Sequence, residues 1–467
     1  MNRRRCIGAA NVALIIGIAG IVLIFTSIVG VLLAGSLMEQ KKSNGKADEV
    51  ANIIEETDSL TSNQSNEKPS GTSKGTSKGT SDSLPDSSSN NPSGNFLDSL
   101  SDYYPNYPQN RQELTEKLEE YKKANKDLVV YQGPVRHIFF HPLIAFPELA
   151  FDGDYISQGF DDWFITVKEF NKILESLYNK NYILIDIKYM YEESEEVGKK
   201  LIPRRDMLLP PGKKPLIISI DDMNYYKYMR QNGVVHKLIL DSEGNISDFS
   251  ITPSGNELIT KENDIVTILD RFVMEHPDFS FMGAKGIAAL TGYEGILGYR
   301  TDNPPAPNIE EEKKEALKII KRLKETGWSF ACHGYGHLDT VKIGLDVLKK
   351  DTQRWKDEVE PLIGPTPVYI FPFGSGVLPG SEKSNYLKEA GFPVMCAVGN
   401  GDYIKYESDV IYMDRIHIDG IAFRDRMPVL KEMFEIDDIV DEVRPWKNQP
   451  NEAPDTQTPG ADAPQDI

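Results

Sequence analysis

Two histidines four residues apart are the first sign of chemistry in this sequence. His333 and His337 belong to the stretch SFACHGYGHLD, in which the apolar run SFAC predicts a short strand, and they are two of the 7 histidines in the chain. Imidazoles at positions i and i+4 lie on one face of a helical turn and can bind one metal ion. The alternative is a pair of solvated loop histidines. The zinc metalloprotease motif His-Glu-x-x-His requires Glu directly after the first His, and this sequence has Gly334 at that position.

Two adjacent carboxylates complete a metal site. Asp221 and Asp222 follow the apolar run PLIISI, which predicts a buried strand. Functional groups of barrels gather at the carboxyl ends of the strands, so we expect these aspartates near the histidines. One carboxylate and two imidazoles form the ligand set of a catalytic zinc site, and the second carboxylate can act as general base. Neighbours on an extended strand point to opposite sides, which would separate the two roles. A turn or helix cap is the ordinary alternative.

The elements that must position these side chains alternate along residues 135–445. The segment TVKEFNKILESLY opens with Thr166 and has Glu169 three residues later, a capping box that predicts the start of a helix. Repeated strand and helix patterns favour a (β/α) barrel or an open doubly wound sheet. Turn signals SEGN and PSGN within residues 231–262 interrupt the alternation and predict a small antiparallel β insert.

The N-terminus predicts a membrane anchor. Residues 1–5 are basic, and residues 6–38 carry no charge and are mostly aliphatic. This span exceeds the roughly 20 residues needed to cross a bilayer and the roughly 7–15 apolar residues of a cleaved signal peptide. We therefore expect a single-pass signal anchor with a cytoplasmic tail at residues 1–5 and an extracellular remainder. Cleavage near LLAGS is the alternative.

The segments around the alternating region have different compositions. Residues 39–95 are rich in Ser, Thr, Gly and Lys and predict a disordered linker. Within residues 96–134, the stretch RQELTEKLEEYKKAN predicts an exposed helix in an N-terminal extension. Residues 446–467 predict a disordered acidic tail.

Overall charge and cysteine content exclude two classes of protein. Lys and Arg total 52 and Asp and Glu total 71, and the resulting net charge of -19 repels phosphate backbones, so we expect no nucleic-acid partner. The 3 cysteines are too few for a disulfide-built scaffold. We interpret Cys332 and Cys396 as buried apolar residues, with one bridge between them as the alternative. The sequence does not predict an oligomeric state.

These motifs resemble those of polysaccharide deacetylases, the NodB-homology domain of carbohydrate esterase family four, in the extracellular membrane-anchored type. SIDDM resembles the family motif Thr-Phe-Asp-Asp-Gly, which implies that Asp221 is the catalytic base and Asp222 a metal ligand. HGYGH resembles His-Ser/Thr-x-x-His, which implies that His333 and His337 are the other ligands. Met223 stands where the family has Gly.

Two later motifs resemble the family less completely. IFPFG keeps Pro372, Phe373 and Gly374 of a motif that contributes to substrate and oxyanion binding, with the Phe373 N–H in the oxyanion hole. The family's Arg is absent before Pro372, and Arg415 on another predicted strand is the candidate to replace it as partner of the base. DRIHIDG offers His417 as general acid. A structural role is favoured over a catalytic or metal-binding role for four other histidines, His137, His141, His236 and His276.

The resemblance implies a distorted, seven-stranded NodB-like (β/α) barrel over residues 135–445. It implies Zn²⁺ or another divalent metal, and removal of N-acetyl groups from a GlcNAc-type wall polysaccharide, either peptidoglycan or poly-N-acetylglucosamine. Two alternatives remain open. One is an O-acetyl esterase acting on wall polysaccharide. The other is an inactive carbohydrate-binding or scaffolding module, which the missing Arg and Met223 suggest.

Overall fold

A computed structural model describes residues 111–125, 127–194, 200–401, 403–407 and 409–448. These residues all belong to one compact unit. The predicted anchor, the predicted linker and nearly all of the predicted acidic tail lie outside the described residues. Within the described ranges, no helix combines the length and the apolar character that crossing a membrane requires.

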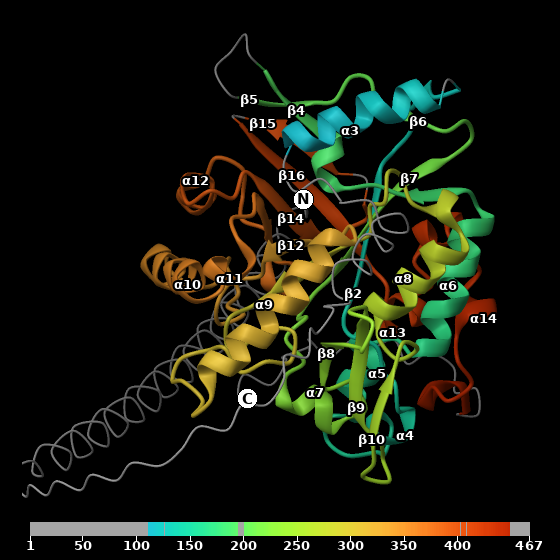
Figure 1. Cartoon of the computed structure of the whole chain (residues 1–467), viewed down its shortest axis with the longest axis vertical. Helices are drawn as coiled ribbons and strands as arrows, with labels where there is room; N and C mark the ends of the chain where they lie inside the picture. Colours follow the sequence, from blue (N-terminus) through green and yellow to red (C-terminus); the bar gives the residue numbers. More distant parts are fainter. Residues whose placement is uncertain (1–110, 126, 195–199, 402, 408, 449–467) are drawn as a thin grey trace, which may run out of the picture. The chain divides into compact units, whose positions relative to one another are not determined.

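Seven parallel strands close into a barrel (Figure 1). The ring closes because Ile416 of the last strand pairs with Ile138 of the first. This closure confirms the predicted seven-stranded (β/α) barrel, and the open doubly wound sheet is wrong. In order around the barrel, the strands are β2 (Arg136–Phe140), β7 (Lys214–Ile220), β11 (Gly286–Leu290), β12 (Ser329–Cys332), β13 (Val368–Ile370), β14 (Val394–Val398) and β16 (Val410–His417).

The barrel is distorted along one edge of β7. The first half of β7 pairs with β3 (Tyr182–Leu184), and its second half pairs with β11, where Ile218 lies opposite Gly286. The same edge of β7 therefore forms its hydrogen bonds first with β3 and then with β11. A further strand, β15 (Ile404–Glu407), pairs antiparallel with β16 outside the ring.

Short antiparallel sheets decorate the barrel. The predicted insert is confirmed as a three-stranded sheet of β8 (Lys237–Leu240), β9 (Ile246–Ile251) and β10 (Glu257–Thr260), with β9 in the middle. Two smaller pairs are β1 (Val129–Val130) with β6 (Leu208–Leu209), and β4 (Tyr191–Ser194) with β5 (Lys200–Pro203). Figure 1 shows β4, β5 and β6 at the end opposite to the insert.

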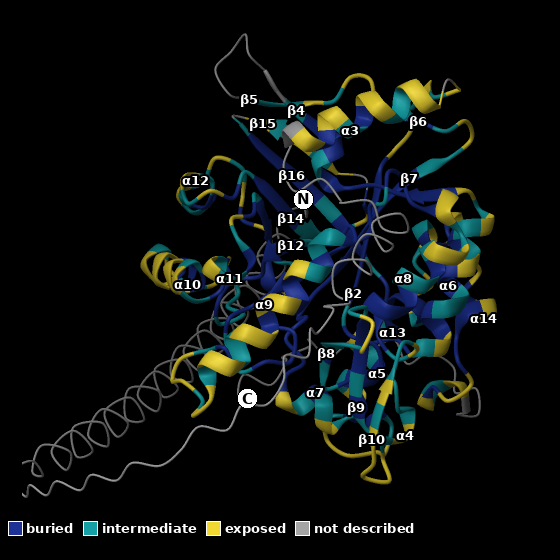
Figure 2. Cartoon of the chain, viewed as in Figure 1, coloured by how far each residue is buried: buried dark blue, intermediate teal, exposed yellow. Residues whose placement is uncertain are grey.

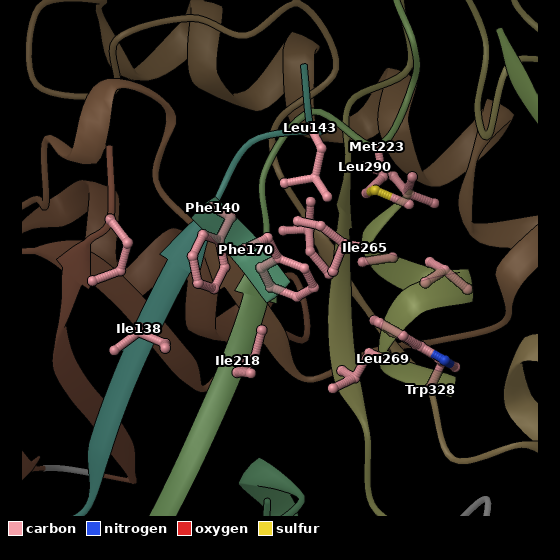
Figure 3. Packing of buried hydrophobic residues seen from close by; sticks show 14 of the residues in the cluster. Ile138, Phe140, Leu143, Phe170, Ile218, Met223, Ile265, Leu269, Leu290 and Trp328 are labelled. Atoms are coloured by element: carbon pink, nitrogen blue, oxygen red, sulfur yellow. The ribbon is translucent and has the colours of Figure 1, made fainter. Parts of the chain in front are cut away.

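Side chains alternate between the barrel interior and the helix layer, as the two-residue period of a strand requires. On β7, Ile218 belongs to the cluster under the helices, whereas Ile217 belongs to a separate inner cluster. Figure 3 shows Ile138, Phe140 and Ile218 against Phe170 of the surrounding layer. The Phe140 and Phe170 rings meet edge to face with centroids 5.2 Å apart. Because both sides of each strand are buried, the strands read as nearly continuous apolar runs.

Helices cover the outside of the barrel, and Figure 2 shows their outward faces as exposed around buried strands. The capping box predicted at Thr166 and Glu169 is present and begins α6. The helices are α4 (Pro147–Ala150), α5 (Ser157–Trp163), α6 (Val167–Asn179), α7 (Lys227–Gln231), α8 (Ile265–Glu275), α9 (Ile309–Glu325), α10 (Leu345–Glu358), α11 (Glu360–Ile363), α12 (Glu382–Glu389), α13 (Gly420–Arg424) and α14 (Ile436–Ile439).

The helix predicted as exposed in the N-terminal extension is instead docked. Leu114 and Leu118 of α3 (Arg111–Ala124) are only 2% and 4% exposed and join the inner cluster. Tyr121, one turn further along, packs edge to face against Phe281. The prediction was wrong because the many charges of this segment obscured an apolar stripe at i, i+4 and i+7.

Both cysteines of the described chain are buried free thiols, as interpreted from the sequence. Cys332 ends β12 and belongs to the cluster under the helices, while Cys396 on β14 belongs to the inner cluster. The alternative of a bridge between them is wrong, since their side chains lie on opposite sides of the barrel wall.

Candidate metal and catalytic site

Five of the predicted site residues lie on or directly after three strands of the barrel, β7, β12 and β16. On β7, the inward Ser219 is followed two residues later by Asp221, which comes directly after the strand. In the same way His333 follows the inward Ala331 of β12, and Arg415 and His417 are inward positions of β16. Because all these strands are parallel, the side chains emerge at the same end of the barrel.

Asp222, His333 and His337 form a three-ligand cluster, and it is the one such group found among the described residues. His333 Nε2 lies 3.9 Å from Asp222 Oδ1, and His337 Nε2 lies 3.8 Å from Asp222 Oδ2. Tetrahedral ligands at zinc distances of about 2.0–2.2 Å are themselves roughly 3.3–3.6 Å apart. These three side chains therefore fit a zinc ion after movements of a few tenths of an ångström.

The two aspartates do not divide their roles in the way expected from an extended strand. Asp222 has a left-handed backbone with φ of 57°, so the chain turns immediately after Asp221. As a result both carboxylates approach the same imidazole, with His333 Nε2 3.9 Å from Asp221 Oδ2 and 3.9 Å from Asp222 Oδ1. This turn also accommodates Met223, which stands in the family's Gly position, because its side chain enters the core (Figure 3) and is 0% exposed.

The two histidines converge through a loop and not through the expected helical turn. Gly334 and His337 have left-handed φ values of 68° and 51°, and the two imidazole centroids are 5.0 Å apart. His333 Nδ1 lies 2.9 Å from the Ile370 carbonyl oxygen. A carbonyl only accepts hydrogen bonds, so Nδ1 carries the proton and Nε2 is free to bind a metal. Burial lowers the pKa of His337 to about 4, which keeps this ring neutral.

Asp221 is held by a two-point ion pair with Arg415. The guanidinium donates to Asp221 Oδ1 and Oδ2 at 2.7 and 2.9 Å and to the Ser219 hydroxyl at 3.1 Å. Burial acts to raise the pKa of Asp221, but the Arg415 charge and hydrogen bonds, together with His333, hold it at about 2. Arg415 on β16 thus takes the place of the Arg that is missing before Pro372 in IFPFG. With a pKa of about 2, Asp221 is ionised throughout the physiological pH range.

His417 is paired with an aspartate that the sequence analysis did not single out. His417 Nδ1 lies 2.8 Å from Asp419 Oδ2, and the other Asp419 oxygen accepts from the Ala422 N–H at the start of α13. Burial acts to lower the pKa of His417, but the hydrogen bond and charge of Asp419 raise it above its ordinary value. Asp419 could have been found from its position directly before the segment GIAF, because an aspartate there predicts the N-cap of a helix.

The turn after β13 places Phe373 beside His337, one of the three candidate metal ligands. The ring of Phe373 is 59% exposed, and its centroid lies 4.6 Å from that of His337. Phe373 has a left-handed φ of 56°, and among the described residues we find no acceptor for its N–H. Pro372 is buried. Position 374 requires Gly for two reasons. Its φ is 66°, and a Cβ there would lie 2.3 Å from Val398 Cγ2.

Tyr226 and Thr291 hold Asp222 and were not predicted from the sequence. The Tyr226 hydroxyl donates to Asp222 Oδ1 at 2.9 Å and also contacts the Thr291 hydroxyl. The ring of Tyr226 stacks on Tyr293 with centroids 4.5 Å apart. Thr291 and Tyr293 follow β11, so the loop that lengthens the chain before His333 supports Asp222 through Tyr226. No residue spacing indicated this contact.

His141 also belongs to this end of the barrel. Its Nδ1 lies 2.9 Å from the Trp163 carbonyl oxygen, which leaves Nε2 as an acceptor when the ring is neutral. Its charge acts to lower the pKa of both Asp221 and His337, so its ring lies within electrostatic reach of both. A structural role was favoured from the sequence for His141, which directly follows β2 and continues the inward positions 137 and 139 of that strand.

The remaining three histidines have structural contacts. His137 is 0% exposed inside the barrel, and its Nε2 lies 2.9 Å from the Ser219 hydroxyl oxygen. His236 in the insert contacts the Ile251 N–H, and His276 packs against Tyr178. These contacts agree with the structural role expected for them.

No family model matches the sequence, and no curated protein is significantly similar to it. Among solved structures, the chain is similar to the Streptococcus pyogenes deacetylase PplD in complex with acetate, at 12% identity over 64% of this chain and 99% of that chain, with a TM-score of 0.37. It is similar to a polysaccharide deacetylase from Bacillus cereus, at 15% identity over 63% of this chain and 69% of that chain, with a TM-score of 0.35. A de-N-acetylase from Aggregatibacter actinomycetemcomitans is 15% identical over 62% of this chain and 94% of its own, with a TM-score of 0.33. The names of these three solved proteins describe them as a deacetylase, a polysaccharide deacetylase and a de-N-acetylase.

Proposed function

We propose that this protein is a metal-dependent deacetylase that removes N-acetyl groups from a GlcNAc-type polysaccharide. The observation that carries the proposal is the meeting of three kinds of groups at one end of the barrel. These are a three-ligand cluster, a separate ionised carboxylate, and a histidine whose pKa is raised. Hydrolysis of an amide requires groups that bind and activate water, stabilise an oxyanion and protonate an amine.

Asp222, His333 and His337 would hold the metal. A bound Zn²⁺ or similar divalent ion supplies Lewis-acid activation of water and of the acetamide carbonyl. Two imidazoles with one carboxylate are a common ligand set for catalytic zinc, and they leave positions for water and substrate. Tyr226 fixes one Asp222 oxygen, which orients the carboxylate before the metal binds.

The other residues would move protons and stabilise charge. Asp221, which Arg415 keeps ionised, orients the attacking water and accepts its proton. The Phe373 N–H donates to the developing oxyanion. His417 donates a proton to the amide nitrogen as the C–N bond breaks, which gives acetate and a free amine.

The structure weakens the reasons for an inactive module. Met223 is accommodated in the core, and Arg415 supplies the missing contact to Asp221. An O-acetyl esterase would use the same residues, and its leaving alcohol would need less help from an acid. The pairing of His417 with Asp419 favours an amine leaving group, because amines leave readily only when protonated.

We also propose that residues 6–38 anchor the chain in the cell membrane with the barrel outside. The support is the long uncharged segment after the basic residues 1–5, followed by the polar residues 39–95. A linker of that length spans roughly 40 Å as a random coil. Such a placement makes a wall polysaccharide the accessible substrate.

Substitutions of the two aspartates should have different effects on metal binding. Asp222→Ala removes a ligand and should lose bound zinc. Asp221→Asn should keep zinc while turnover falls by about 10²–10⁴-fold, because the proton acceptor is lost. Metal content of purified protein and acetate release measure the two effects, and thermal unfolding checks that Arg415 without its ionised partner leaves the barrel folded. Equal loss of zinc in both variants would refute the division of roles.

The alkaline limit of activity should depend on Asp419. A general acid must be protonated, so turnover should fall as the pH rises through the pKa of His417, which Asp419 raises. Asp419→Asn keeps an N-cap for α13 but removes the charge, so the fall should begin at lower pH. Asp425→Asn should shift the fall less, in the same direction, since Asp425 contributes a weaker field. An alkaline limb that stays in place in Asp419→Asn contradicts the assignment of His417.

Substrate class can be decided by acetate release from matched oligomers. We expect release from N-acetylglucosamine oligomers, with no release after the metal is chelated and recovery on adding zinc. Faster acetate release from O-acetylated oligomers that are otherwise identical to the N-acetylated ones would identify an esterase instead. Oligomer binding without any acetate release would identify a binding module.

Protease accessibility tests the proposed topology. Protease added to intact cells should release the folded barrel, because the predicted linker at residues 39–95 lies outside the membrane. Detergent-treated cells serve as the control for cleavage at the same sites. A barrel that resists protease in intact cells and is cleaved only after lysis would overturn the extracellular placement.

A further inference from the structure

The loop between His333 and His337 is fastened to helix α10. Asp351, Arg354 and Glu358, which contact the loop, lie at i, i+3 and i+7 of this helix and therefore share one face. The side chain of Tyr335 in the loop makes two contacts with α10. Its hydroxyl donates to Glu358 at 2.7 Å, and the Arg354 guanidinium lies 4.0 Å from its ring centroid. Trp355 Nε1 donates at 2.8 Å to the Leu290 carbonyl at the end of β11.

Asp351 makes the contacts nearest to the metal ligands. It is 9% exposed, and its Oδ2 accepts from the Tyr335 N–H and its Oδ1 from the Gly336 N–H, each at 2.8 Å. One carboxylate therefore fixes two consecutive peptide groups between His333 and His337. Hydrogen bonds from a backbone N–H to a charged acceptor are about twice as strong as those between neutral groups.

The glycines of HGYGH fit this contact. A Cβ on Gly334 would lie 3.0 Å from Asp351 Oδ2, and a Cβ on Gly336 would lie 3.2 Å from Oδ1. Gly334 also has a φ of 68°, which side chains disfavour. Glycine at both places lets the carboxylate approach the backbone closely, and this approach fixes the loop path that brings His337 back toward His333.

His337 depends on this loop more than His333 does. The His333 N–H donates to the Leu290 carbonyl at 3.0 Å, and its Nδ1 donates to the Ile370 carbonyl at 2.9 Å. Within the described part of the chain, the His337 ring has ring contacts and its approach to Asp222, but we find no hydrogen bond that fixes its Nδ1. The position of His337 is therefore set mainly by its backbone.

From these contacts we propose that Asp351 is a positioning residue for the metal centre. Its carboxylate holds the loop so that His337 reaches the ion together with His333 and Asp222. Asp351 does not bind the metal itself, because its two oxygens are engaged by the backbone. This inference rests on the proposed function in that it requires the cluster to bind a divalent ion.

Zinc affinity of the full chain in detergent tests the role of Asp351. Asp351→Asn replaces one acceptor oxygen by an NH₂ group that faces a backbone N–H. We expect about 10–100-fold weaker zinc binding in competition with a chromophoric chelator, the loss typical for groups that orient metal ligands. Asp346→Asn, an exposed change on the same helix, should bind zinc like the original chain. Tyr335→Phe loses the Glu358 contact but keeps both backbone bonds and should also retain the affinity.

The outcomes separate this inference from the proposed function. A folded Asp351→Asn protein that binds zinc as tightly as the original chain overturns the inference, even if its thermal stability has fallen. An original chain that binds no divalent ion overturns both. If Asp351→Asn does not fold, Gly336→Ala takes its place, because its Cβ crowds Asp351 Oδ1. Weaker zinc binding by Gly336→Ala supports the inference, and unchanged binding overturns it.

Discussion

The buried ion pair between Arg415 and Asp221 is the interaction on which the candidate site depends. It joins β16 to the end of β7 across 194 positions of sequence, and both side chains are at most 5% exposed. Removing two charges from water costs several kcal/mol per ion, and only well-matched partners offset that cost. The bidentate geometry and the Ser219 hydroxyl provide such partners. Because β2 lies between the two strands in the barrel wall, the pair links the last strand of the ring to its second strand from inside the barrel.

Around this pair, each of the three candidate metal ligands is supported by a different part of the chain. Tyr226 from the turn after β7 orients Asp222, the Ile370 carbonyl at the end of β13 sets the tautomer of His333, and Asp351 of α10 fixes the loop of His337. Rigid supports of this kind reduce the conformational freedom that ligands lose on metal binding. They also explain why Gly334 and the left-handed Asp222 occur beside the chemistry, where a strained backbone is held by many neighbours.

The antiparallel insert and the side chains that meet at one end of the barrel were predicted because turn signals, apolar alternation and strand ends are local patterns. The alternating pattern favoured a barrel and an open doubly wound sheet alike, and the seven-stranded barrel was expected from the resemblance to a known family. Arg415 was named as a candidate only because the motif before Pro372 lacks its Arg, so that another strand had to supply the partner of the base. Other contacts depend on tertiary packing that no local pattern records, such as Asp351 reaching the loop from a later helix. The left-handed turn at Asp222 was missed because Asp221 and Asp222 were expected to be neighbours on an extended strand, whereas Asp222 has a φ of 57°.

A crystal structure measured at the zinc absorption edge tests the central claim most directly. The account predicts one anomalous peak within bonding distance of Asp222, His333 and His337, with Asp221 paired to Arg415 and not coordinated. A peak bound through Asp221 in place of Asp222, or metal soaked to saturation without a peak between the two histidines, would contradict it.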